Sequence, residues 1–367
     1  MNINSVILWL AAFGVIIGSL DYLFDNRLSG NRFELGKEFE KGIHALGPLT
    51  LGMVGVISLA PVLGRLLRPV AFPVLHFLGA DPSVLASVLA IDMGGYPLAK
   101  ELALTTTSAA FSGLIVASML GATLVFSIPI ALSIIEKKDK IFFVKGLLAG
   151  FMTIPIGAFV GGLAAGFPLR EVALNDLPVL IISVIIAISL GFFPRLTILF
   201  AEKIGKLIMF LIVLALAIAI IQSLTGVVVV PGTAPISEGF RIVGLIAIVL
   251  AGTFPLVKIV TIVLAKPFKR LGNFLKIEEM AVSGFLASLV NNIPTLNLMK
   301  DMGPRGKILN SAFMVSGAFV FGDHLGFVAS VDKTMISYVI LAKLTAALLA
   351  IPLAIIIEKY TENVSEL

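Results

Sequence analysis

The sequence predicts an all-α integral membrane protein with about nine to eleven transmembrane segments, and its composition and apolar runs support this class. The 367 residues are 58% hydrophobic and only 13% charged, whereas a soluble domain carries about 25% charged residues. The apolar runs approach the ~20 residues that span a bilayer as a helix. They are continuous, unlike the ~10-residue alternating segments of an outer-membrane barrel. We therefore expect a single polytopic membrane domain over residues 1–367.

The first apolar run covers residues 3–20. It lacks the basic start and the small-residue cleavage site of a signal peptide, so we interpret it as a retained helix. A charged loop, 21–44, follows it, and the later loops are shorter. The other predicted segments are 45–64, 83–99, 107–135, 141–167, 177–193, 207–230, 240–265, 280–297, 308–331 and 334–357.

Two halves of the chain carry prolines at matching positions. Pro97 and Pro294 lie 197 positions apart, and so do Pro155 and Pro352. Interrupted hydrophobic segments at matching positions of an internal repeat are the best sequence indication of a transporter's binding site.

The spacing predicts two repeats of roughly 120 residues. The first repeat covers 45–167 and the second covers 240–357, with connecting helices over 168–239.

The charges of the loops favour one topology. If all eleven segments cross the bilayer, the two sides carry 13 and 11 Lys and Arg residues. If 83–99 and 280–297 are re-entrant hairpins, the sides carry 18 and 6, as the positive-inside rule expects. This second topology has nine spans and two hairpins that enter from opposite faces, so the repeats are inverted. It predicts an external N-terminus and a cytoplasmic C-terminus.

The two predicted hairpins carry polar residues where their helices break. Asp92 lies in the first break beside Gly94 and Gly95, and glycine permits unwound backbone. Asn291 and Asn292 occupy the equivalent place in the second hairpin. Exposed carbonyl and N–H groups at helix ends can bind a cation or an oxygen. Proline and glycine are also common in ordinary membrane helices. The interpretation therefore depends on the two breaks occurring at matching positions of the two repeats.

Ionisable residues inside apolar segments add to the candidate site. Asp323 and His324 lie within 308–331, and a charge at a helix centre costs about 2.5–3.5 kcal/mol on insertion scales. Asp323 binds a cation or pairs with Lys343, and His324 relays protons or orients Asp323. Tyr96 can supply a cation–π face or simple packing. Glu101 binds a cation or, as we favour, pairs with a lysine near the membrane surface.

Several function classes are excluded by what the sequence lacks. There are no cysteines, which removes disulfides and thiolate metal sites. Neither a nucleotide-binding loop nor a H-E-x-x-H motif occurs, and the three histidines are widely spaced. We therefore expect no metal and no cofactor. The net charge of +5 comes from loops that orient the protein in a membrane, so we expect no nucleic-acid partner.

The motifs together resemble those of the ethanolamine-utilisation inner-membrane transporter family. The resemblance rests on motifs that run in order along most of the chain: Ile91–Gly95 with Leu98–Leu102, Phe126–Pro129, Thr153–Gly157, Asn291–Pro294 and Gly322–Phe327. Residues 168–240 carry no matching motif. The resemblance implies a permease of the bacterial cytoplasmic membrane that takes up ethanolamine. It does not imply an enzyme.

Ethanolamine is compatible with the candidate residues. Like a lysine head group with a pKa of roughly 10, it is mostly an ammonium ion at neutral pH. Asp92 and Asp323 can bind that cation, and Asn291 or Asn292 can hydrogen-bond its hydroxyl. We expect alternating access, in which one repeat rocks against the other.

Two other functions compete with a carrier. An intramembrane aspartyl protease would use Asp92 and Asp323 as a dyad, although the sequence around Gly322 does not fit one. An ammonium or water channel would use the same broken helices as a pore. The energy source is H⁺, Na⁺ or neither, and the sequence is compatible with a homo-oligomer.

Overall fold

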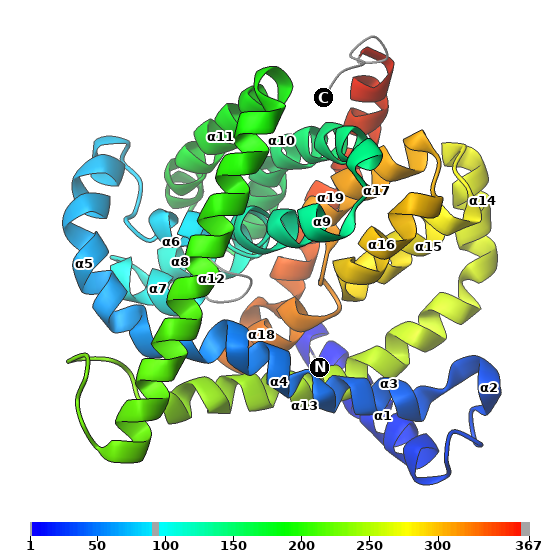
Figure 1. The fold of residues 1–367 in the computed structure, drawn as a ribbon, viewed down its shortest axis with the longest axis horizontal. Coiled ribbons are helices and arrows are strands. Elements are labelled where there is room, and N and C mark those ends of the chain that lie inside the picture. Colours follow the sequence, from blue (N-terminus) through cyan, green and yellow to red (C-terminus); the bar gives the residue numbers. More distant parts are fainter. Residues whose placement is uncertain (1, 90–94, 361–367) are drawn as a thin grey trace.

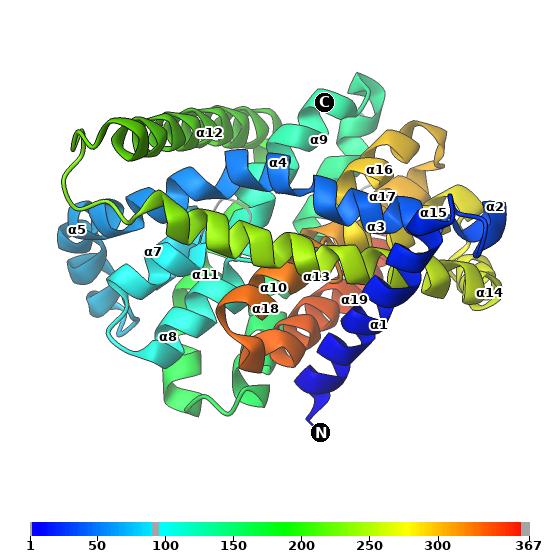
Figure 2. The same ribbon diagram turned by 90° about the horizontal axis from the view of Figure 1, so that it is seen from below.

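The computed structural model describes residues 2–89 and 95–360 (Figures 1 and 2). Every regular element in these two ranges is helical, which confirms the predicted all-α class. The first half contains α1 (Ile3–Leu23), α2 (Gly30–Phe33), α3 (Leu35–His44), α4 (Leu46–Leu49), η1 (Thr50–Val54), α5 (Gly55–Phe77), α6 (Val84–Leu89), α7 (Gly95–Leu102), α8 (Thr106–Ala110), η2 (Phe111–Val116), η3 (Ala122–Ser127), α9 (Ile128–Ile134), η4 (Lys137–Asp139) and α10 (Lys140–Ala164).

The second half begins with two long helices that join the first half to the rest. It contains α11 (Leu169–Phe192), α12 (Pro194–Thr225), α13 (Ile236–Val263), α14 (Ala265–Leu275), α15 (Glu279–Val290), α16 (Asn292–Leu298), η5 (Met299–Asp301), α17 (Pro304–Gly317), α18 (Asp323–Val331), η6 (Lys333–Met335) and α19 (Ile336–Tyr360). Seven helical stretches of the described chain are long and apolar enough to cross a bilayer. They are Ile3–Leu23, Leu35–Phe77, Lys137–Ala164, Leu169–Phe192, Pro194–Thr225, Ile236–Val263 and Lys333–Lys359.

Two segments that the sequence predicts as continuous spans are interrupted. We call 107–135 the first interrupted helix and 308–331 the second interrupted helix. The segment 107–135 contains a turn at 117–119, and the segment 308–331 contains a turn at 318–322. In the second turn Phe319 has a φ of +63°, a left-handed conformation that a bulky residue rarely adopts. Backbone groups that leave a helix at membrane depth are tolerated only where protein satisfies them. Both breaks lie within the packed interior of the molecule, as the contacts below show.

Both predicted hairpins fold back to the side from which they start. At the base of the first hairpin (α6 and α7), the Leu104 N–H donates to the Asp81 carboxylate over 2.9 Å. At the base of the second (α15 and α16), a Cβ placed on Gly303 would lie 2.1 Å from Glu278 Oε1. Within that hairpin the Thr295 hydroxyl donates to the Gly284 carbonyl over 2.7 Å. Residues before and after each hairpin are therefore neighbours, as re-entry requires.

Contacts between loops define two faces of the molecule. The hairpin-1 face includes Asp81 and Thr334, whose carbonyl accepts from the Asn4 side chain over 2.8 Å. The hairpin-2 face includes the ion pair between Asp139 and Lys307, at 2.5 Å. These contacts join the loops that the re-entrant topology assigns to one side. The orientation of the faces in the membrane and the inverted repeats stay predictions.

Close helix packing supports the core around α10. A Cβ on Gly157 would lie 2.5 Å from the Ala342 carbonyl oxygen, and one on Gly161 would lie 2.5 Å from the Ala342 side chain. The small residues of α10 therefore allow α19 to approach closely. Figure 1 shows α10 and α19 in the middle of the fold, between α11 and α17.

Candidate functional site

The break between α15 and α16 is formed by two asparagines. Asn291 has an extended backbone (φ −156°, ψ 136°), and its side chain accepts a hydrogen bond from the Ile293 N–H. This bond of 2.8 Å caps α16 in the way that asparagine commonly caps a helix. The Asn291 side-chain oxygen is therefore engaged by the backbone of its own hairpin.

Asn292 points into the interior and is 0% exposed. Its Nδ2 donates to Ser127 Oγ over 2.8 Å, which joins the hairpin to the first interrupted helix. Its Oδ1 is buried and accepts no hydrogen bond from the described residues. A buried polar atom without a partner costs about 1–3 kcal/mol, so native proteins keep few of them. Asn292 thus presents a buried, unused acceptor at the tip of the hairpin.

The end of α15 forms backbone hydrogen bonds with the turn that interrupts the second interrupted helix. The Phe319 N–H donates to the Ser288 carbonyl over 2.9 Å. The Phe321 N–H donates to the Leu289 carbonyl over 2.8 Å. These bonds satisfy backbone groups that the turn releases, as an interior break requires.

Gly322 completes this contact because it allows two backbones to meet. A Cβ on Gly322 would lie 2.0 Å from the Val290 carbonyl oxygen, a distance that no side chain tolerates. Asp323 and His324 follow directly and begin α18. The structure therefore places the predicted pairs Asn291–Asn292 and Asp323–His324 beside one contact.

An aromatic ring packs on His324, which is 1% exposed. Its ring stacks on that of Phe319, with centroids 5.2 Å apart. Phe126, from the first interrupted helix, meets Phe319 edge-on at 5.8 Å. Asp323, by contrast, is only partly buried. The imidazole is thus held in an apolar wall, while the carboxylate lies at its edge.

Lys343 brings a positive charge to the same centre. It is fully buried on α19, and its Nζ donates to the Ser118 carbonyl over 2.6 Å. Ser118 lies in the turn of the first interrupted helix. Lys343 also lies within electrostatic reach of His324. The sequence offered Lys343 as a partner of Asp323, and the structure gives it a helix-break carbonyl as a further partner.

The predicted residues of the first hairpin are only partly placed. Asp92 and Gly94 lie outside the described residues. Gly95 is buried at the start of α7, and the ring of Tyr96 has the Lys100 Nζ 5.8 Å from its centroid. Glu101 is exposed. No hydrogen bond or ion pair within the described ranges joins Tyr96 or Glu101 to the central residues, and Glu101 has no lysine partner there.

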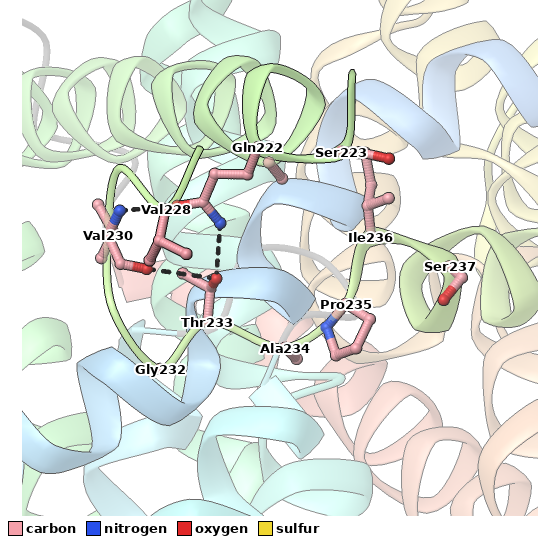
Figure 3. Close-up of a pocket in the computed structure, with 11 residues that line it drawn as sticks. Gln222, Ser223, Val228, Val230, Gly232, Thr233, Ala234, Pro235, Ile236 and Ser237 are labelled. Atoms are coloured by element: carbon pink, nitrogen blue, oxygen red, sulfur yellow. Dashed lines mark hydrogen bonds between the residues drawn. The ribbon is translucent and has the colours of Figure 1, made fainter. Parts of the chain in front are cut away.

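Four pockets lie away from this centre. The pocket of Figure 3 has a volume of about 440 Å³ and lies between the end of α12 and the start of α13. Its main polar group is Gln222, which donates to Thr233 over 2.9 Å and accepts from the Val230 N–H over 2.7 Å. None of the residues that line this pocket is ionisable, so it offers no carboxylate for a cation. Asn292 and His324 line none of these four pockets, and both side chains are closed off from solvent in this conformation.

Comparison with known proteins identifies the family. The family model described as "Ethanolamine utilisation protein, EutH" matches residues 3–357. The chain belongs to the EutH family. Over 97% of its length it is 46% identical to the "Probable ethanolamine permease EutH" of Listeria monocytogenes, covering 94% of that protein. Over 97% of its length it is 39% identical to the protein of the same name from Escherichia coli, covering 96%.

The Bacillus subtilis protein YxeR, named as uncharacterized, is 42% identical over 95% of this chain and 94% of its own length. No solved structure matches the chain. Because the EutH family is a family of permeases and not of enzymes, the protease hypothesis is wrong. The apolar spans and the relatives make this EutH-family chain a multi-pass protein of the bacterial cell membrane.

Several polar residues of the EutH-family centre were missed in the sequence. Ser288 and Thr295 share a hydrogen bond of 2.8 Å across the second hairpin. The Thr123 hydroxyl donates to the Val315 carbonyl over 2.8 Å and joins the two interrupted helices. Serine and threonine are common in membrane helices, and these partners lie far apart in the sequence, so no local pattern distinguishes them.

Proposed function

We propose that this chain imports ethanolamine across the bacterial cytoplasmic membrane by alternating access. The names of its EutH relatives supply the substrate. The observation that carries the proposal is the buried Asn292 Oδ1, which has no hydrogen-bond partner within the described residues. Ethanolamine brings donors at both ends, an ammonium group and a hydroxyl. Binding either donor would remove the cost of the unused acceptor.

Asn292 is a better candidate than Asn291 for the substrate's polar end. The Asn291 oxygen is engaged by the Ile293 N–H, whereas the Asn292 oxygen is free to accept. The bond from Asn292 to Ser127 fixes the amide against the first interrupted helix. A substrate held by Asn292 would therefore touch both the second hairpin and that helix.

The charges of the centre suit a single cation. Lys343 contributes one positive charge, and we assign Asp323 and, from its place in the sequence, Asp92 to the ammonium group. Two carboxylates and one lysine leave a net charge of −1. One ethanolammonium ion neutralises it, which lowers the electrostatic cost of holding the ion away from water.

The closed centre favours a carrier over a pore. Asn292 and His324 are cut off from solvent, and a carrier passes through such an occluded state as it opens to one side at a time. Counterflow distinguishes the two: a carrier exchanges labelled for unlabelled ethanolamine with saturation. Weakly saturable flux without exchange would indicate a channel.

The test is radiolabelled ethanolamine uptake in proteoliposomes at acidic external pH, where little neutral amine leaks across the bilayer. We expect saturable uptake in the wild type and its loss in Asp323→Asn and in Asn292→Ala. Asn297→Ala is the matched control, because Asn297 is an exposed asparagine of the same short helix. Equal loss in Asn297→Ala, or full activity in Asn292→Ala, would contradict the assigned site.

A further inference from the structure

Asp176 is a buried carboxyl group that the proposed binding site does not use. It lies in α11, one of the seven long apolar helices, and is 8% exposed. Its Oδ1 is buried without a hydrogen-bond partner, and no ion pair involves Asp176 in the described chain. Ionisable residues within membrane helices are rare and mark ion or proton pathways by default.

Three of the elements that pack against the helix of Asp176 carry no charge. The elements α6, α8 and η2, which pack against α11, contain no ionisable residue. In α10 such residues are Lys140 and Lys145, near its start, and in α12 they are Arg195, Glu202, Lys203 and Lys206, in its first half. An unpaired carboxylate buried in this way costs several kcal/mol, and binding a proton removes that cost.

The neighbouring carboxylates on the hairpin-1 face already accept hydrogen bonds. The Glu171 carboxylate accepts from Ser108 over 2.7 Å and from Thr105 and Thr107. The Asp81 carboxylate accepts from the Ser83 and Leu104 N–H groups. Arg170 lies at the start of α11, about two turns before Asp176. Within the described residues, Asp176 therefore has no ion-pair partner on its own helix or among these neighbouring side chains.

Asn175 joins Asp176 to the base of the first hairpin. Its Oδ1 accepts from the Asp81 N–H over 2.7 Å, and its Nδ2 donates to Ser108 Oγ over 2.9 Å. These bonds tie α11 to the residues just before α6 and to the start of the first interrupted helix. A movement of the first hairpin against α11 would therefore change the surroundings of Asp176.

A pocket on the hairpin-1 face extends to the residue next to Asp176. It has a volume of about 370 Å³, and its polar lining includes Asp81, Glu171, Asn175, His76 and Arg170. Further along α11, Ser183 is fully buried, and its hydroxyl has no partner in the described residues. It lies seven residues on, about 10 Å along the same helix face. The polar groups thus continue from the pocket past Asp176 into the interior.

We propose that Asp176 is a proton-binding site that couples ethanolamine import to the proton gradient. A hydronium ion in the pocket protonates the carboxylate, which yields a neutral carboxylic acid and water. The neutral group is stable in the closed state, and it releases its proton to water when the opposite face opens. Proton binding and the conformational change are then linked, since each favours the same state of the carrier. This inference rests on the proposed transport function.

Infrared spectroscopy tests the proton site without any transport. We expect a C=O stretching band of a buried carboxylic acid in the wild type and its loss in Asp176→Asn. Glu238→Gln is the matched control, because it removes an exposed carboxyl of α13 and should leave the band unchanged. A band of equal strength in Asp176→Asn would overturn the proposal.

Transport assays separate coupling from exchange. We expect Asp176→Asn to keep counterflow but to lose accumulation driven by an acid-outside gradient, and Asp176→Glu to restore part of it. Leak of neutral amine would move ethanolamine toward the acidic outside, so it cannot mimic this accumulation. Wild-type counterflow without gradient-driven accumulation would overturn proton coupling and leave the transport function intact. Absence of counterflow would contradict the transport function, and the infrared band would still decide whether Asp176 binds a proton.

Discussion

The bases of the two hairpins are held by different chemistry. At the first hairpin, Asp81 and Asn175 bind backbone N–H and hydroxyl groups. At the second, buried Lys307 pairs with Asp139 over 2.5 Å, and Arg305 pairs with Glu358 over 3.1 Å. The first face also has pockets of about 370 and 550 Å³, and the second has one of about 330 Å³ beside Lys269 and Glu279. The difference between the faces is therefore that one is held by hydrogen bonds and the other by ion pairs.

This difference indicates which face is harder to open. Separating a buried ion pair exposes two charges to an environment that solvates them poorly, which is costly. A hydrogen bond to a hydroxyl or a backbone group exchanges with water at a net cost of about 0.5–1.5 kcal/mol. We infer that the hairpin-2 face is the more firmly closed in this conformation, and the following variants test that comparison.

The largest expected effect is that of Asp139→Asn. It leaves the Lys307 ammonium buried without its carboxylate, and breaking one partner of a buried pair costs about 3–5 kcal/mol. The amide oxygen of the new side chain can still accept a hydrogen bond, but the negative charge is lost, and the ring of Phe142, with its centroid 5.7 Å from the Lys307 Nζ, compensates the ammonium only weakly. We expect a clear fall in the thermal unfolding midpoint of the detergent-purified protein.

The matched control for this variant is the double substitution Asp139→Asn with Lys307→Met. Removing both charges eliminates the unpaired ammonium, so most of the lost stability should return. If the double variant is as unstable as Asp139→Asn alone, the ion pair does not account for the closure of this face.

A smaller effect is expected for Asn175→Ala at the first hairpin. The substitution leaves the buried Asp81 N–H without its acceptor, which costs about 1–3 kcal/mol. The unfolding midpoint should fall less than in Asp139→Asn. Asn273→Ala, at an exposed asparagine of α14, is the control and should leave the midpoint unchanged. A larger fall in Asn175→Ala than in Asp139→Asn would reverse the comparison between the two faces.

The hairpins could be predicted from the sequence, but the interrupted helices could not. Matching prolines and loop charges can be read directly from the sequence, and they led to the predicted hairpins 83–99 and 280–297. The turn at 318–322 instead depends on carbonyls of Ser288 and Leu289, about thirty positions away. An apolar run gives no sign of such a partner, so 308–331 was predicted as continuous.

Some residues of the candidate site could likewise be predicted from the sequence, and others could not. Asn292 and Asp323 stand out because polar residues are rare in apolar segments. The pairing of Asp139 with Lys307 joins residues 168 positions apart, which no spacing rule anticipates. Asp176 lies in a region without motifs, and only its burial distinguishes it from a carboxylate at a membrane surface.

The smallest effect on stability should come from removing an exposed ion pair of the hairpin-2 face. Lys269 and Glu279 lie 2.5 Å apart, and both are largely accessible to solvent. The hydrogen bond and the negative charge of Glu279 raise the pKa of Lys269. A raised pKa contributes stability below the unfolded pKa, and that stability is lost as the pH rises through the folded value.

Because solvent screens this pair, Glu279→Gln should leave the unfolding midpoint unchanged at neutral pH. The pKa of Lys269, measured by the pH dependence of its acylation, should fall toward its ordinary value. Glu238→Gln is the control and should leave that pKa unchanged. A fall in the midpoint as large as that of Asp139→Asn would mean that the number of ion pairs, and not their burial, closes the hairpin-2 face.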